Sequence, residues 1–283
     1  MIERRPAFSA AFAPEALRQL APIPPLDEIT AEWAWGDSTG KGVKVAVIDS
    51  GIESSHPGLS GPPVAGYVRI TEDPDGALCH DTSPHADAFG HGTACAGIIR
   101  GIAPECELYS VQVLGPRCGG KGIIFAAGLR WAIDNGMQVC NLSLGTTMKD
   151  FFGILHELAD LAYFKNVMLV AAANNMPIPS FPAVYSSVIS VACHDLKDPL
   201  LYYYNPEPPV EFGAPGIGLR VPWLGGGWLT VSGNSFAAPH ITGIVARILA
   251  KHPALTVFQM KSILRALAAN VAHPNRDTAS ATS

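Results

Sequence analysis

Three residues of the types used in nucleophilic catalysis stand beside apolar segments of the chain. Asp49 closes the apolar run VAVID, His91 lies between two glycines at the expected start of a helix, and Ser235 shortly precedes the apolar run ITGIVARILA. Taken singly, the serine could be a helix N-cap and the aspartate a turn cap. Together the three are the attacker, the general base and the orienting acid of a catalytic triad. We expect Gly90 and Gly92 to leave room beside the imidazole ring.

The same chemistry needs hydrogen-bond donors for the oxyanion of the tetrahedral intermediate. The segment VAAANNMP ends an apolar run in Asn174 and Asn175, and either amide could donate. The backbone N–H of Ser235, at a helix start, could supply a second donor. Two asparagines after a strand are also typical of a turn, because asparagine tolerates left-handed backbone angles.

Alternating apolar segments predict the elements that would hold these residues. Strands are expected over residues 43–49, 107–114, 137–144, 167–173 and 187–193, and helices over 91–100, 122–136 and 151–166 and from near Ser235 and Thr256. This alternation predicts a three-layer α/β fold, with a mostly parallel central sheet and helices on both faces. Sites in such folds form at the carboxyl ends of the strands, where Asp49, Ser143 and Asn175 stand.

Composition limits the classes of function. The 283 residues carry a net charge of −5, which gives no support for nucleic-acid binding, and no apolar run is long enough to span a membrane. The N-terminus has no continuous apolar region typical of a signal peptide, so a cytoplasmic location and six free cysteine thiols are expected. Residues 1–25, rich in alanine and proline, are interpreted as an extension that inhibits the enzyme or packs as an arm, and residues 26–283 as one domain.

Five motifs resemble, in order, the motif blocks of the subtilisin-like serine proteases, or subtilases. They are VAVIDSGIESSHPGL, GHGTACAG, NLSLG, VAAANN and SGNSFAAPH, and the similarity runs from about residue 40 to residue 265. The resemblance implies a subtilisin-like fold and an endopeptidase that cleaves extended polypeptide through an acyl-enzyme. It assigns Ser235 as nucleophile, His91 as general base, Asp49 as orienting acid and Asn175 as oxyanion donor. Asn174 replaces the family's usual glycine, and we expect it to take the backbone angles that glycine would adopt.

The resemblance also implies where substrate binds. Two edge segments would pair with an extended peptide, one formed by Ser143, Leu144 and Gly145 and the other by Cys118, Gly119 and Gly120.

The pocket for the residue before the scissile bond would have Met176 at its rim and Ala183 at its base. An uncharged, shallow pocket predicts a preference for leucine, methionine or a similar residue over basic and acidic ones. Gly122 would leave the pocket three residues upstream open to aromatic side chains.

Several alternatives use the same residues. A dedicated peptide-maturation protease, or a transpeptidase or macrocyclase, would share the acyl-enzyme, and a non-catalytic peptide-binding scaffold would share only the cleft.

One segment contains several potential zinc ligands: Cys79, His80, Asp81, His85, Asp87 and His91. No cofactor or metal is predicted; the calcium loop that many relatives insert after the catalytic histidine is missing, and a calcium site near Asp195 and Asp198 is left open.

Overall fold

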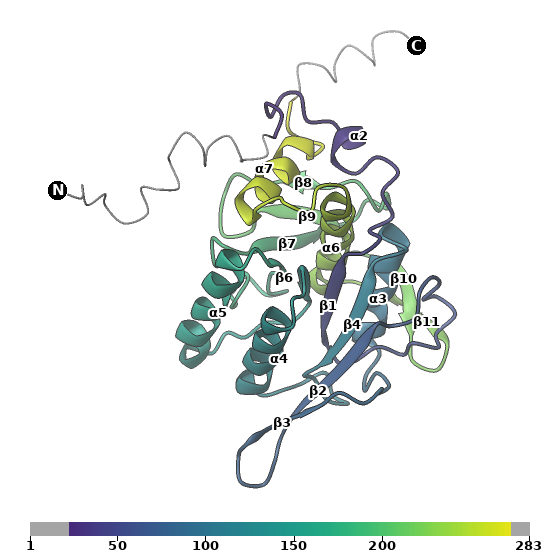
Figure 1. Cartoon of the computed structure of the whole chain (residues 1–283), viewed down its shortest axis with the longest axis vertical. Helices are drawn as coiled ribbons and strands as arrows, with labels where there is room; N and C mark the ends of the chain where they lie inside the picture. The colour runs from purple at the N-terminus through teal and green to yellow at the C-terminus, as the bar shows by residue number, and fades with distance from the viewer. Residues whose placement is uncertain (1–22, 273–283) are drawn as a thin grey trace, which may run out of the picture.

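A nine-stranded sheet forms the centre of the computed structural model, which describes residues 23–272 (Figure 1). Across the sheet the strands are β3 (Leu78–Asp81), β2 (Gly66–Glu72), β4 (Glu107–Gln112), β1 (Lys44–Asp49), β5 (Val139–Leu142), β6 (Met168–Ala172), β7 (Ile189–His194), β9 (Phe212–Pro215) and β8 (Tyr203–Tyr204). The inner strands pair in parallel, while β3 and β8 are antiparallel edges. The expected α/β fold is confirmed.

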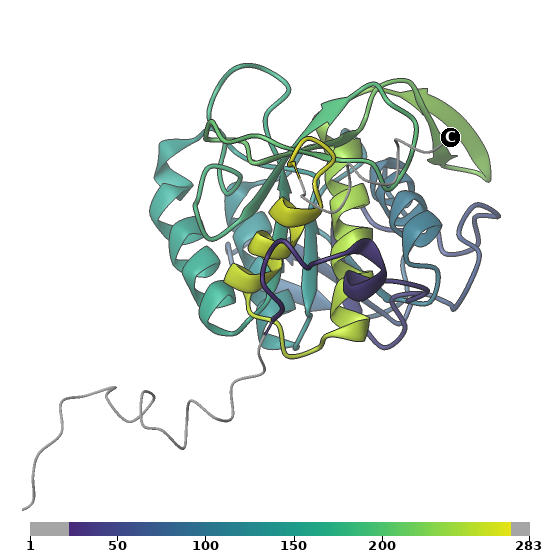
Figure 2. The same ribbon diagram turned by 90° about the horizontal axis from the view of Figure 1, so that it is seen from above.

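Helices cover both faces of this sheet. They are α2 (Ala31–Ala34), α3 (His91–Ile102), α4 (Gly122–Asp134), α5 (Phe152–Phe164), α6 (Asn234–Lys251) and α7 (Val257–Leu267), with a 3₁₀ turn, η2 (Lys149–Phe151), before α5. Alternate residues of β1 point to opposite faces: Val45 and Val47 join the core under α3 and α6, whereas Ala46 and Ile48 join the core under α4 and α5. Figure 2 shows these two helical layers on either side of the strands. Burial on both faces explains why β1 reads as a continuous apolar run.

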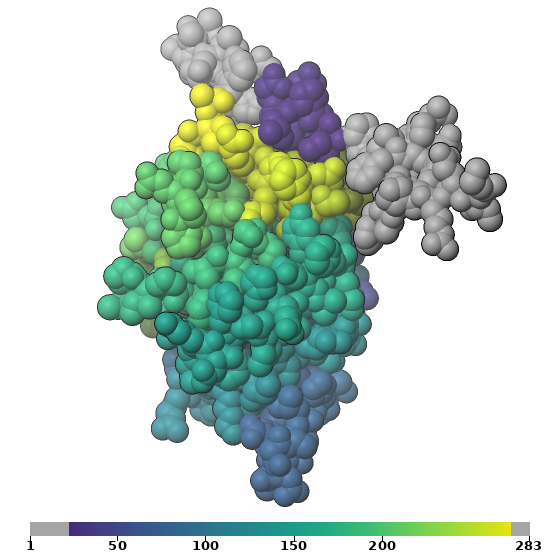
Figure 3. All heavy atoms as spheres, turned by 90° about the vertical axis from the view of Figure 1, so that its left-hand side faces the viewer, coloured from purple at the N-terminus to yellow at the C-terminus, as the bar shows by residue number. Residues whose placement is uncertain are grey.

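The remaining strands were not anticipated from the sequence. All four residues of β3 are exposed, and the hairpin that β3 forms with β2 projects from the body of the molecule (Figure 3). A second hairpin pairs β10 (Leu219–Trp223) with β11 (Gly227–Val231) outside the main sheet. Neither hairpin has the long apolar run of a buried strand, and β10 contains Pro222, which argues against a strand when the sequence is read alone.

The first described residues lie at the far end of α6 from Ser235. Lys251, the last residue of α6, donates from Nζ to the carbonyl of Glu32 at 2.6 Å, and Nε2 of the next residue, His252, donates to the carbonyl of Trp33 at 2.8 Å. The helix α6 has 18 residues and is therefore about 27 Å long. Residues 32–33 contact its last turn and Ser235 lies in its first turn, so nearly the whole length of α6 separates them. Residues 1–22, most of the predicted extension, lie outside the described residues. In the described part of the chain, no helix combines the length and the apolar character needed to cross a membrane.

Candidate active site

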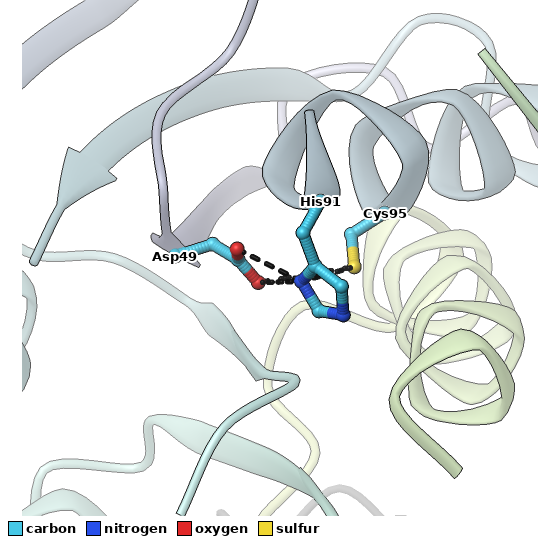
Figure 4. Close-up of side chains that lie close together, drawn as sticks. All are labelled: Asp49, His91 and Cys95. Carbon is cyan, nitrogen blue, oxygen red and sulfur yellow. Dashed lines mark hydrogen bonds and ion pairs between the residues drawn. The ribbon is translucent and has the colours of Figure 1, made fainter. Parts of the chain in front are cut away.

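Asp49 and His91 form a buried pair at the carboxyl end of β1 (Figure 4). Nδ1 of His91 lies 2.9 Å from both carboxylate oxygens of Asp49, and the side chain of Asp49 is fully buried. A carboxylate only accepts, so Nδ1 carries the hydrogen and Nε2 is left free to accept a proton. Burial alone would lower the pKa of His91, but the adjacent Asp49 charge outweighs it and holds this pKa well above its ordinary value of 6.5.

A close backbone contact brings His91 to this position. A Cβ added to Gly92 would lie 2.1 Å from the carbonyl oxygen of Gly51, so any side chain there would push α3 away from the turn that follows β1. Gly90, which has a φ of +109°, packs in the same way against Trp223. Protein atoms therefore occupy the space that we expected these glycines to leave open. Their effect is to let the start of α3 approach Asp49.

Asp87, which the sequence offered only as a potential zinc ligand, caps α3. Its Oδ1 accepts from the Ser50 hydroxyl and from the N–H groups of Phe89 and Gly90, at 2.7–2.9 Å. Its Oδ2 accepts from the N–H and the hydroxyl of Thr93, at 2.8 and 2.6 Å. Helix starts carry unpaired N–H groups, and Gly90 has no side chain to satisfy them. The signal in the sequence is an aspartate a few residues before an expected helix start.

Ser235 stands in the first turn of α6 and lines the same cleft as His91. This cleft has a volume of about 460 Å³, and Asn175 also lines it. Within residues 23–272, no hydrogen bond joins the Ser235 hydroxyl to His91, and no acceptor pairs with the backbone N–H of Ser235. Catalytic hydrogen bonds are often long in the absence of substrate. The unpaired N–H is available to an anion at this helix start.

The Asn175 side chain is fixed against the beginning of α6. Its Oδ1 accepts from the backbone N–H of Asn234 at 2.8 Å, which leaves its Nδ2 as a free donor. A Cβ on Gly233 would lie 3.5 Å from Ser235 Oγ and from both terminal atoms of the Asn175 amide, so nucleophile and amide flank the same point. Asn234, which was not predicted to be part of the site, donates from its own amide to the carbonyls of Ala173 and Asn174.

The backbone of Asn174 does not have the left-handed angles that were expected of it. Among the described non-glycine residues, only Cys118 and Asn166 have a positive φ, so Asn174 does not adopt the angles of a left-handed glycine. Its Oδ1 instead accepts from the N–H of Met176 at 2.9 Å and closes a turn.

The predicted wall of the specificity pocket is corrected by the structure. Met176 is 63% exposed and, with the buried Ala183, lines an apolar hollow of about 350 Å³ that adjoins the cleft and shares Ala173, Asn174 and Ser180 with it. The turn closed by Asn174 directs the chain outward at Met176, and Ala183 packs into the core under α4 and α5. Ser180, which was not predicted from the sequence, does line the catalytic cleft, and its side chain lies 3.6 Å from a Cβ built on Gly145.

The two predicted edge segments both border the cleft. Ser143, Leu144 and Gly145 line one side, and Cys118, Gly119 and Gly120 line the other. The space beside Gly122 is not free, however. A Cβ on Gly122 would lie 2.4 Å from the ring of Phe151, so this glycine accommodates an aromatic side chain of the protein itself. Gly122 itself still lines the cleft, so an upstream pocket open to aromatic side chains stays a prediction.

The six potential zinc ligands are not gathered into one site. Within the part of the chain that the structure describes, the group of close ligand atoms is Asp49, His91 and Cys95, within 4.8 Å of one another. Burial raises the pKa of the Cys95 thiol, which keeps it protonated and a weak ligand. Cys79, His80 and Asp81 lie on the exposed strand β3 instead. All six cysteines are free thiols in the structure.

Comparisons with known proteins agree with this geometry. The sequence profile described as the subtilase family matches residues 40–280. The minor extracellular protease Epr of Bacillus subtilis (strain 168) is 36% identical over 266 residues, which cover 89% of this chain and 39% of Epr. Subtilisin E of the same organism is 34% identical over 245 residues, 81% of this chain and 61% of that protein. The chain thus spans less than two thirds of either relative.

Solved structures agree as well. Sphericase superposes with a TM-score of 0.67 at 28% identity, covering 80% of this chain and 83% of that one. A cold-adapted subtilisin-like serine proteinase gives a TM-score of 0.64 at 26% identity, covering 81% and 83% of the two chains.

A buried aspartate–histidine pair beside a serine at a helix start is the arrangement of a serine hydrolase. The profile match over residues 40–280 then makes the assignment specific: the chain belongs to the subtilase family.

Proposed function

We propose that this protein is a serine endopeptidase whose nucleophile is Ser235. His91 takes the proton of the Ser235 hydroxyl, and Asp49 holds the imidazole with Nδ1–H toward itself and stabilises the imidazolium that forms. The observation that carries this proposal is the buried Asp49–His91 pair in the cleft that Ser235 also lines. The amide of Asn175 and the N–H of Ser235 supply the donors for the oxyanion.

The substrate proposed is an extended polypeptide. Edge segments 118–120 and 143–145 flank the cleft, and such edges bind a peptide through its backbone while pockets select its side chains. Aminolysis uses the same acyl-enzyme as hydrolysis. Mass spectrometry of the products formed with and without an added amine acceptor distinguishes a protease from a transpeptidase. The cytoplasmic location remains a prediction, which cell fractionation tests.

Asn175→Ala is expected to lower kcat by about a hundred- to a thousand-fold with little change in KM, because the Nδ2 donor would bind the developing oxyanion and not the ground-state substrate. This is the size known for the equivalent donor of subtilisin. Asn174→Ala is the matched control, since the Asn174 side chain closes a turn instead. Steady-state kinetics on a chromogenic peptide measures both. A harmless Asn175→Ala beside a damaging Asn174→Ala would overturn the assignment.

The residue before the scissile bond is expected to be leucine, methionine or a similar apolar residue. No described acidic residue lines the cleft, so a buried lysine or arginine side chain would lack a partner. Ser180→Gly should deepen the pocket and shift the preference toward larger side chains by about ten-fold. Cleavage of a mixed peptide library, read by mass spectrometry, gives both results. Dominant cleavage after lysine or arginine would contradict this proposal.

We also propose that no calcium ion binds at α3. This helix runs without insertion from His91 to Ile102, and its sequence HGTACAGIIRGI has no carboxylate or amide side chain to ligate calcium. The melting temperature should therefore be the same with and without EGTA. A large decrease on chelation, reversed by added calcium, would reveal a calcium site elsewhere in the protein.

A further inference from the structure

Pro239 lies inside α6, where it changes the surroundings of the candidate nucleophile. A proline within a helix has no N–H to donate to the carbonyl four residues earlier, and its ring clashes with that carbonyl. The residue four positions before Pro239 is Ser235. The backbone carbonyl of the nucleophile is therefore deprived of its helical donor and must find a partner outside α6.

Two side chains from other elements provide that partner. The hydroxyl of Ser143, just after β5, donates to the Ser235 carbonyl at 2.6 Å. The thiol of Cys95, on α3, lies 3.6 Å from the same oxygen and is the weaker donor. Because Ser143 is only 6% exposed, little water competes for this carbonyl.

A second hydrogen bond orients the Ser143 hydroxyl. Nδ2 of Asn141 donates to Ser143 Oγ at 3.0 Å, so the hydroxyl accepts there and directs its own hydrogen to Ser235. Oδ1 of Asn141 lies 3.0 Å from the hydroxyl of Thr242, two turns further along α6. Asn141 and Thr242 are fully buried. These hydrogen bonds therefore form a chain from Ser235 through Ser143 and Asn141 to Thr242, which begins and ends on α6 and passes through the end of β5.

We propose that Ser143 is a positioning residue that replaces the N–H missing at Pro239 and so fixes the backbone of the nucleophile. The inference rests on the proposed function of Ser235. Segment 143–145 would pair with substrate through its backbone, which a change of the Ser143 side chain leaves in place. Loss of the hydroxyl therefore affects the placement of Ser235 more than the binding of substrate, and the effect falls on kcat.

Ser143→Ala tests this directly. We expect kcat to fall about ten- to a hundred-fold, the size that follows when a buried carbonyl loses its strong donor and keeps only the weak Cys95 thiol, while KM stays within about two-fold. Pro239→Ala alone should leave kcat within about two-fold, and it returns a backbone N–H to α6. In the double variant this N–H supplies the Ser235 carbonyl, so most of the lost kcat should return. Ser143→Cys, which keeps a weak donor, should fall between wild type and Ser143→Ala, and it stands in for Ser143→Ala if that variant does not fold.

Thermal unfolding of the wild type, Ser143→Ala, Pro239→Ala and the double variant gives a measurement that does not depend on activity. Ser143→Ala should lower the melting temperature more in the Pro239 background than in the Pro239→Ala background. An inactive wild type would refute the proposed function, whereas this difference in melting temperature would still report on the hydrogen bond. Equal losses of kcat and of melting temperature in both backgrounds, or a loss confined to KM, would overturn the positioning role.

Discussion

Ser235→Ala is expected to give a folded protein whose turnover on peptides falls by about a million-fold, the size known for the nucleophile of subtilisin itself. The hydroxyl that would attack the scissile carbonyl is lost, while the helix start, the backbone N–H and the Asn175 amide remain. The residual rate should still exceed that of the uncatalysed reaction, because the oxyanion donors and the substrate edges are intact. Initial rates at high enzyme concentration measure the loss.

The matched control for this variant is Ser232→Ala. Ser232 lies in the short connection between β11 and α6, and its hydroxyl accepts from the N–H of Gly218. Its removal should leave kcat within a few-fold, and circular dichroism should show both variants folded. Comparable activity of Ser235→Ala and wild type would contradict the assigned nucleophile.

Asp49→Asn is expected to lower kcat by about ten-thousand-fold. The asparagine amide can donate to Nδ1 of His91 and so stabilise the tautomer in which Nε2 already carries a hydrogen. Only a neutral imidazole with a free Nε2 can take the serine proton. In the wild type, Asp49 holds the pKa of His91 well above 6.5, so kcat/KM should rise with pH through a midpoint above that value. Without the Asp49 charge, the His91 pKa falls and the midpoint of the residual activity should move to lower pH.

The pH profile separates this role from a merely structural one. Asp81→Asn, a change on the exposed strand β3, is the control and should move neither kcat nor the midpoint. An Asp49→Asn variant with a lowered rate but an unshifted midpoint would show that Asp49 does not set the charge of His91. Intact activity in that variant would remove Asp49 from the catalytic group altogether.

Five of the parallel strands, β4, β1, β5, β6 and β7, could be predicted because most of their residues are buried, whereas the parallel strands β2 and β9 were not predicted. Such strands read as continuous apolar runs, and β1, expected over residues 43–49, spans Lys44–Asp49. The same reasoning cannot find β3, whose residues are all exposed, or β10, which contains a proline. Those strands depend on pairing with a neighbour, which a short segment of sequence does not reveal.

The polar residues of the site were predictable by type, but the contacts that hold them were not. Asp49, His91 and Ser235 are recognisable because their side chains match defined chemical roles. Ser180 was missed because its place in the cleft depends on a turn that directs Met176 outward. Short-range spacing cannot show which of several residues in a loop faces a pocket.

Residues that act through long-range hydrogen bonds are harder to predict still. Asp87 lies 37 positions from its hydroxyl partner Ser50, and Ser143 lies 92 positions from Ser235. Nothing in the local sequence joins these pairs. A proline four residues after a candidate nucleophile does signal that its carbonyl needs an outside donor. The proline thus predicts that the Ser235 carbonyl needs a donor, but only the folded structure identifies Ser143 as that donor.

Labelling with a serine-directed phosphonate, mapped by mass spectrometry, identifies the activated nucleophile of this protein. The reagent phosphonylates a hydroxyl only where a base activates it and oxyanion donors receive the phosphoryl oxygen. We predict one label per chain, on the peptide that contains Ser235, with none on Ser235→Ala and a much slower reaction on Asp49→Asn. No label on the folded wild-type protein, or a label on another residue that persists in Ser235→Ala, would show that Ser235 is not the activated nucleophile.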